Sequence, residues 1–139
     1  MEAKIKAIRF EVPGNPVPKG RPRFSFKSGH AYTPRKTKIY EELIAKEYQK
    51  SIGEILPYSP LKIDVIAVFE IPHSYSKKKK ESMIETGCTK RADIDNIVKS
   101  VLDALNGIAY IDDSCVVEIY GLKKWGTEPK TEVVIHYEE

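Results

Sequence analysis

The sequence predicts an α+β fold: a single domain, residues 1–139, in which two main helices pack on a mixed β-sheet. The length of 139 residues is enough for one hydrophobic core. Alternating apolar residues, typical of strands, occur near both ends and in the middle of the chain. Apolar residues at three- and four-residue spacing, typical of helices, occur in two segments between them. Because strands and helices succeed one another in this mixed order, and no long linker divides them, we expect one α+β domain.

The first elements are a strand and a small hairpin. In the sequence IKAIRFEV, apolar side chains alternate from Ile8 to Val12, which predicts a strand. The sequence PGNPVPKGRPRF, residues 13–24, follows as a loop rich in proline and glycine; all of its charges are positive, and we call it the basic loop. Residues 23–34 then predict a hairpin that turns at Ser28 and Gly29.

The first helix is expected to start at Thr33 and Pro34, with the threonine as N-cap and the proline in the first helical position. It should end near Gly53. Its side chains at helical spacing are Tyr40, Leu43, Ile44, Glu47 and Tyr48.

The clearest strand is LKIDVIAVFEI, residues 61–71. Every second residue is apolar, and Ile66 and Val68 make the other face partly apolar, which is typical of a central strand. The polar segment 73–90 contains four consecutive lysines, Lys77–Lys80. We expect either a solvated, mobile loop or a flap that touches a phosphate backbone.

The second helix is predicted over residues 96–105, and Asn106 and Gly107 supply its stop. Its buried stripe comprises Ile97, Val98, Val101, Leu102 and Leu105. Residues 115–125 and 131–138 predict a closing pair of strands.

The charge is unevenly distributed along the chain. Residues 1–50 hold 12 Lys and Arg against 5 Asp and Glu, which gives +7; residues 51–100 give +1 and residues 101–139 give −5. A basic first part and an acidic last part suggest a polyanionic partner. No apolar run approaches the roughly 18 residues that a membrane span needs, and the charged N-terminus does not resemble a signal peptide. We therefore expect a cytoplasmic protein without a membrane partner or a small-molecule cofactor.

Carboxylates crowd into the stretch KRADIDNIVKSVLDALNGIAYIDD. If the segment before the helix is extended, Asp93 and Asp95 project from one face, and on the helix Asp95, Lys99 and Asp103 share one stripe. Asp112 and Asp113 would meet the first pair if the chain returned beside the helix start. Carboxylates so close together repel unless a cation intervenes, and Mg²⁺ is the hard cation that prefers oxygen ligands.

A structural interpretation competes with this one. In it, Asp95 would be no more than the N-cap of the helix, and Lys99 would form an ordinary ion pair with it one turn away. Asp112 and Asp113 would form an ordinary turn. The EF-hand pattern does not fit, because its sixth position would be Val98 rather than glycine. Walker A, GxGxxG, HExxH and GxSxG motifs are also missing from the sequence.

The ordered set DxDN, Lys, DALNG and DD resembles the RusA family of Holliday junction resolvases, and so do GNPVPKGRPRF and YTPRKTKIYE upstream. The resemblance spans roughly Phe10 to Val117. It implies a RusA-like fold and a Mg²⁺-dependent endonuclease, with Mn²⁺ as a possible substitute. It also implies a homodimer that cleaves four-way DNA junctions in recombination and repair, often encoded by prophages.

Carried over to this chain, the resemblance makes Asp93, Asp95 and Asp113 the metal-binding catalytic carboxylates and Lys99 the catalytic lysine. Asp112 would be an auxiliary metal-binding acid, and Asn96 would position the DNA. We expect the phosphate backbone to be held by five basic residues: Lys19, Arg21, Arg23, Lys90 and Arg91. Two alternatives stay open: a metal-dependent nuclease for other branched or duplex DNA, and a catalytically inactive DNA-binding module.

Overall fold

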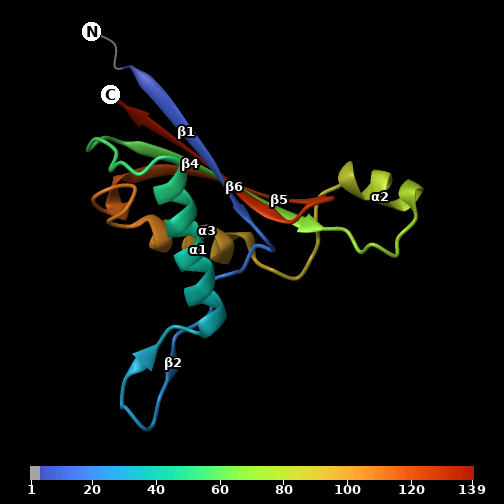
Figure 1. Cartoon of the computed structure of the whole chain (residues 1–139), viewed down its shortest axis with the longest axis horizontal. Helices are drawn as coiled ribbons and strands as arrows, with labels where there is room; N and C mark the ends of the chain where they lie inside the picture. Colours follow the sequence, from blue (N-terminus) through green and yellow to red (C-terminus); the bar gives the residue numbers. More distant parts are fainter. Residues whose placement is uncertain (1–3) are drawn as a thin grey trace.

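The central element of the structure is a four-stranded sheet with the strand order β1-β6-β4-β5 (Figure 1). The structure is a computed structural model and describes residues 4–139. Its strands are β1 (Ile5–Pro13), β4 (Leu61–Glu70), β5 (Val116–Gly126) and β6 (Lys130–Glu138). β4 is antiparallel to β6 and parallel to β5, and β6 is antiparallel to β1. The predicted mixed sheet and α+β class are confirmed.

Two helices, α1 (Arg35–Ser51) and α3 (Ile94–Leu105), lie on the same side of this sheet and pack against each other (Figure 1). A short helix, α2 (Lys77–Ile84), lies beyond one end of the sheet. The strands β2 (Arg23–Phe24) and β3 (Ala31–Tyr32) pair in a hairpin that projects below the body. None of the helices in residues 4–139 combines the length and the apolar character that a membrane crossing requires.

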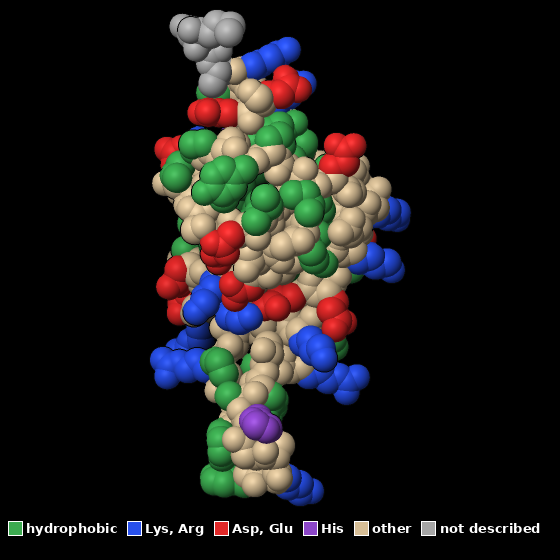
Figure 2. Space-filling view, turned by 90° about the vertical axis from the view of Figure 1, so that its left-hand side faces the viewer, with side chains coloured by type: hydrophobic (Ala, Val, Ile, Leu, Met, Phe, Trp, Pro, Cys, Tyr) green, Lys and Arg blue, Asp and Glu red, His purple; other side chains and the backbone are tan. Residues whose placement is uncertain are grey.

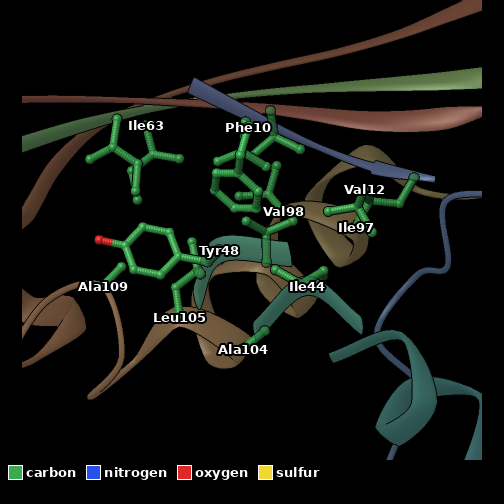
Figure 3. Packing of buried hydrophobic residues seen from close by; sticks show 14 of the residues in the cluster. Phe10, Val12, Ile44, Tyr48, Ile63, Ile97, Val98, Ala104, Leu105 and Ala109 are labelled. Carbon is green, nitrogen blue, oxygen red and sulfur yellow. The ribbon is translucent and has the colours of Figure 1, made fainter. Parts of the chain in front are cut away.

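The hydrophobic core lies between the sheet and the two helices (Figure 3). Alternate residues of β4 face it, and Ile63 pairs with Ile135 on one side and Ile119 on the other. From the helix side, Tyr48 meets the ring of Phe10 edge-on, with 5.5 Å between ring centres. Each fully buried aliphatic or aromatic side chain contributes roughly 1.5–3 kcal/mol. This packing fixes α3 over β4 and beside β5.

The start of α1 differs from the prediction by one residue. Pro34, not Thr33, occupies the N-cap position, and its extended backbone places it outside the helix. Proline has no side-chain acceptor, and no side chain forms a capping hydrogen bond at this end. The predicted end is confirmed, because the helix stops at Ser51 and Gly53 adopts a positive φ of 75°.

The lysine-rich segment is helical where a loop was expected. The hydroxyl of Ser76 caps α2 by accepting the backbone N–H of Lys79 at 3.2 Å. Lysine is a good helix former, and exposed ammonium groups repel only weakly through water. The prediction of a mobile loop at Lys77–Lys80 is therefore wrong, and the alternative of a flap that touches a phosphate backbone stays a prediction.

Two further details correct the sequence interpretation. Helix α3 begins at Ile94, two residues before Asn96, so Asp95 lies in the first helical turn and not on an extended segment. The two closing strands exist, but β4 lies between them, so β5 and β6 do not pair with each other. The expected stop is confirmed: Asn106 is the C-cap of α3 and Gly107 follows with a φ of 78°.

Candidate active site

A pocket of about 450 Å³ lies between α3 and β5. Its apolar wall consists of Ile94, Val98, Leu102, Ile119 and Gly121. Close packing of the helix on the strand accounts for the glycine, because a Cβ there would lie 3.0 Å from Ile94 and 3.3 Å from Val98. Four charged residues complete the lining: Asp95, Lys99, Asp103 and Asp113. The fold thus brings the charged stripe of α3 into one pocket with Asp113, which follows the helix in sequence.

The helical periodicity places the first three of these charged residues. Asp95, Lys99 and Asp103 are four residues apart, so they follow one another along one face of α3. Their shared stripe is as expected from the sequence. Because the opposite face carries buried residues such as Val101, the charged stripe is turned away from the core.

Asp113 reaches the pocket because the chain turns back after α3. It begins the short 3₁₀ helix η1 (Asp113–Cys115), and its backbone N–H donates to Oδ1 of Asn106 at 3.2 Å. The hydroxyl of buried Tyr110 donates to the carbonyl of Leu102 at 2.7 Å, which ties the returning loop to α3. Burial, and then the nearby carboxylates of Asp113, Asp103 and Asp112, raise the pKa of Tyr110. The phenol therefore stays protonated and keeps its donor role.

Asp93 and Asp112 do not line the pocket, although each precedes a residue that does. Asp93 is the N-cap residue of α3, yet its side chain forms no capping hydrogen bond. Asp112 accepts a hydrogen bond from the hydroxyl of Ser114, which lowers the pKa of Asp112. The predicted acids therefore divide into two that line the pocket and two beside it.

Lys99 has no carboxylate partner among residues 4–139, which argues against its structural interpretation as a helix ion pair. Asp103, one turn along, pairs instead with Lys19, at 3.1 Å between Nζ and Oδ2. Lys19 also pairs with Glu41 on α1. Burial opposes the charged form of Lys19, but the hydrogen bonds to Glu41 and Asp103 outweigh it and raise the pKa of Lys19.

The basic loop before the hairpin is fastened to the helices of the site. The backbone N–H of Lys19 donates to the carbonyl of Asn96 at 2.8 Å, and the hydroxyl of Ser100 donates to that of Val17 at 3.2 Å. At Gly20 a Cβ would lie 2.9 Å from the ring of Pro34, so only glycine fits here without displacement. These contacts hold the loop against α1 and α3.

The other predicted DNA-binding residues lie on two surfaces. Arg21 and Arg23 line a second cavity of about 540 Å³, together with Lys36. Arg91 is exposed next to the start of α3, and the ammonium of Lys90 lies 5.5 Å from the centre of the Phe69 ring. Asn96 lies in the first turns of α3, where its backbone carbonyl accepts the hydrogen bond from Lys19 of the basic loop.

Three residues near these sites were not selected from the sequence. The sequence predicts Asn106 only as a helix stop, yet its side chain also positions Asp113 by accepting the hydrogen bond from its backbone N–H. Lys123 on β5 donates to the carbonyls of Lys90 and Ala92, at 2.7 and 2.8 Å, and so anchors the segment before Asp93. Lys36 contributes a third cation to the second cavity. Local periodicity gives no signal for such contacts, because it identifies the face of a helix or strand and not the residue that the side chain meets.

The pocket suits a hard cation by its donor type. Asp95 and Asp113 offer carboxylate oxygens to one space, and neither belongs to an ion pair of the described residues. Within residues 4–139, no three Asp, Glu, His or Cys side chains are gathered closely enough to form a complete ligand set. Mg²⁺ typically binds through one or two carboxylates and keeps several waters, so two acids at one pocket fit it.

Two comparisons with known proteins show what the chain is similar to. The chain is 39% identical over 137 residues to the uncharacterized protein YqaN of Bacillus subtilis (strain 168), a match that covers 94% of this chain and 96% of that protein. A family model described as Endodeoxyribonuclease RusA matches residues 13–136, a range that includes the pocket, the basic loop and all four predicted aspartates. By the extent of this match, and with the α+β fold that it requires, the chain belongs to the RusA endodeoxyribonuclease family.

Proposed function

We propose that this protein is a Mg²⁺-dependent endonuclease that resolves four-way DNA junctions as a homodimer, in recombination and repair. Membership of the RusA family implies endodeoxyribonuclease activity. The single observation that carries the finer proposal is the pocket in which Asp95 and Asp113 lie with Lys99, an ammonium without a carboxylate partner among the described residues. An unpaired cation beside two carboxylates suits a site that receives a phosphodiester.

In the proposed reaction, the oxygen of a water forms a bond to phosphorus, one P–O ester bond breaks, and a proton passes to the leaving oxygen. Asp95 and Asp113 would hold Mg²⁺, with Asp93 and Asp112 as neighbouring acids. The metal, when bound, supplies Lewis-acid charge that stabilises the transition state. Lys99 would offset the negative charge that develops on the phosphoryl oxygens.

DNA would be held outside the pocket by the basic residues. Arg21, Arg23, Lys90 and Arg91 would contact phosphates, which position the duplex without specifying its sequence. Lys19 would contribute mainly by holding the basic loop in place, since carboxylates already surround its ammonium. Asn96 would help position the DNA from the first turns of α3, close to the loop that it holds.

The edge strand β5 supports the proposal of a homodimer. On the side away from β4, β5 has no partner strand in residues 4–139 apart from one isolated bridge between Gly87 and Lys124. The strand also exposes the apolar side chains of Val117, Ile119, Tyr120 and Leu122. Such an edge favours pairing with another strand. A second copy related by a two-fold axis would cover it, and Ile119 also lines the pocket, so two sites would lie beside the interface.

The decisive experiment compares cleavage of a four-way junction, a flap and a linear duplex, with Mg²⁺ and with EDTA. We expect Mg²⁺-dependent, symmetric cleavage of the junction. Asp95→Asn should abolish cleavage while junction binding persists or tightens, because a phosphate meets less negative charge. Sedimentation in the same buffer should give the mass of a dimer. Preferred cleavage of flaps or duplex would favour a different nuclease, and binding without any cleavage would favour an inactive DNA-binding module.

A further inference from the structure

The hairpin β2–β3 is a small arm without a core of its own. Two residue pairs, Arg23 with Tyr32 and Phe24 with Ala31, join its strands. Its turn is closed by backbone hydrogen bonds of Ser25 with His30 and Gly29. Figure 2 shows the arm at the bottom of the molecule, with hydrophobic side chains along one side. Its residues 23–32 are not part of the hydrophobic core cluster.

The arm nevertheless presents three aromatic rings to solvent. Phe26 is 94% exposed, Phe24 57% and Tyr32 49%. The two phenylalanine rings lie edge to face with their centres 5.5 Å apart, so they form one exposed apolar cluster. Large apolar side chains gathered outside the core typically mark an interaction surface.

The positive charge around the rings indicates an anionic partner. Residues 12–40 contain seven Lys and Arg and not one Asp or Glu. Three of these cations, Arg21, Arg23 and Lys36, line the cavity at the base of the arm. A surface that combines positive charge with accessible aromatic faces suits single-stranded nucleic acid, in which phosphates meet the cations and bases stack on the rings.

The arm is also continuous with the candidate active site. Just before the hairpin, the backbone of Lys19 is bonded to α3 at Asn96, and its side chain is paired with Asp103 of the pocket. DNA held at the pocket would therefore meet the base of the arm. This continuity favours DNA over an anionic lipid surface as the occupant.

We propose that Phe24 and Phe26 stack on the bases that flank a DNA branch point, so that the arm distinguishes branched from linear DNA. The inference rests on the proposed function, since it assumes branched DNA as the substrate. In a continuous duplex each base is stacked on its neighbours and the rings gain little. At a branch point this stacking is interrupted, and bases become accessible to the arm.

The test measures binding to a four-way junction and to a linear duplex in EDTA, with 2-aminopurine beside the branch point. We expect Phe26→Ala to weaken junction binding at least fivefold, which is the lower end of the effect of one stacked base, and duplex binding less than twofold. The change in 2-aminopurine fluorescence when the protein binds should become smaller as well. The dependence of affinity on salt should not change, because no phosphate contact is lost.

Tyr58→Ala is the matched control, because Tyr58 is 78% exposed and lies outside the basic tract. It should bind both DNAs like the wild type. Wild-type junction binding by Phe26→Ala, or equal losses on junction and duplex, would overturn the proposal. Phe26-dependent binding to anionic vesicles without Phe26-dependent junction binding would overturn it too. If the wild type cleaves the junction, any of these contrary results rejects the stacking proposal and leaves the nuclease proposal standing. A 2-aminopurine signal that depends on Phe26, found without cleavage of the junction, supports stacking and rejects the proposed nuclease.

Discussion

Removing the charge of Lys19 should lower the stability of the protein, whereas removing the charge of Arg21, two residues away in the basic loop, should weaken DNA binding. Lys19 is 18% exposed and bridges Glu41 and Asp103, so it joins α1 to α3. Arg21 is exposed and has no carboxylate partner among residues 4–139. The substitutions Lys19→Met and Arg21→Met remove one charge each while they keep most of the aliphatic stem.

The loss in the free energy of unfolding caused by Lys19→Met can be estimated from the partners of Lys19. A hydrogen bond to a charged group contributes about 1.5–3 kcal/mol, and partial exposure of Asp103 weakens its share. We therefore expect Lys19→Met to cost about 2 kcal/mol, which lowers Tm by about 7 °C for a chain of this length. Arg21→Met should leave Tm unchanged and reduce the slope of log K against log salt by about 0.9.

The assay pairs thermal unfolding with DNA binding across a salt series for both variants. Because the pKa of Lys19 is raised, its stabilising effect is present below the ordinary lysine pKa of 10.5 and is lost as the pH rises above its raised pKa. The Tm difference of Lys19→Met should accordingly shrink in strong alkali. An unchanged Tm together with a reduced salt slope for Lys19→Met would refute this reasoning and make Lys19 a phosphate contact.

Two further predictions concern single side chains. Lys99→Ala should slow junction cleavage at least tenfold, about 1.4 kcal/mol in the activation free energy, with Tm unchanged; normal cleavage with a lower Tm would make Lys99 a structural residue. Burial raises the pKa of Tyr40 to about 12, although its hydrogen bond with Thr131 acts in the opposite direction. Because an unfolded tyrosine ionises near pH 10, stability should fall between about pH 10 and 12, by up to roughly 2–3 kcal/mol from this residue. Denaturation of Tyr40→Phe at both pH values should show a smaller loss, and equal losses would exclude the phenol as the cause.

Local periodicity predicted the long strands and the helices α1 and α3 from the sequence alone, but not the polar helix α2. The alternation over residues 61–71 predicted the central strand, and the spacing after Asp95 predicted the helix that carries Lys99. A side chain's place on a helix or strand depends only on neighbours within a few residues, so one face can be identified without the rest of the fold. For the same reason the stripe of charges on α3 was foreseeable.

Tertiary structure decided which distant parts meet. Asp103 pairs with Lys19 rather than with Lys99 because of where the basic loop docks on α3. The insertion of β4 between β5 and β6 likewise depends on how the strands pack together. Contacts between residues far apart in sequence depend on the packing of the whole core, and no local pattern encodes them. The sequence thus predicted the charged side chains of the site, while the return of Asp113 to the pocket came from the packed fold, because loop and helix share one core.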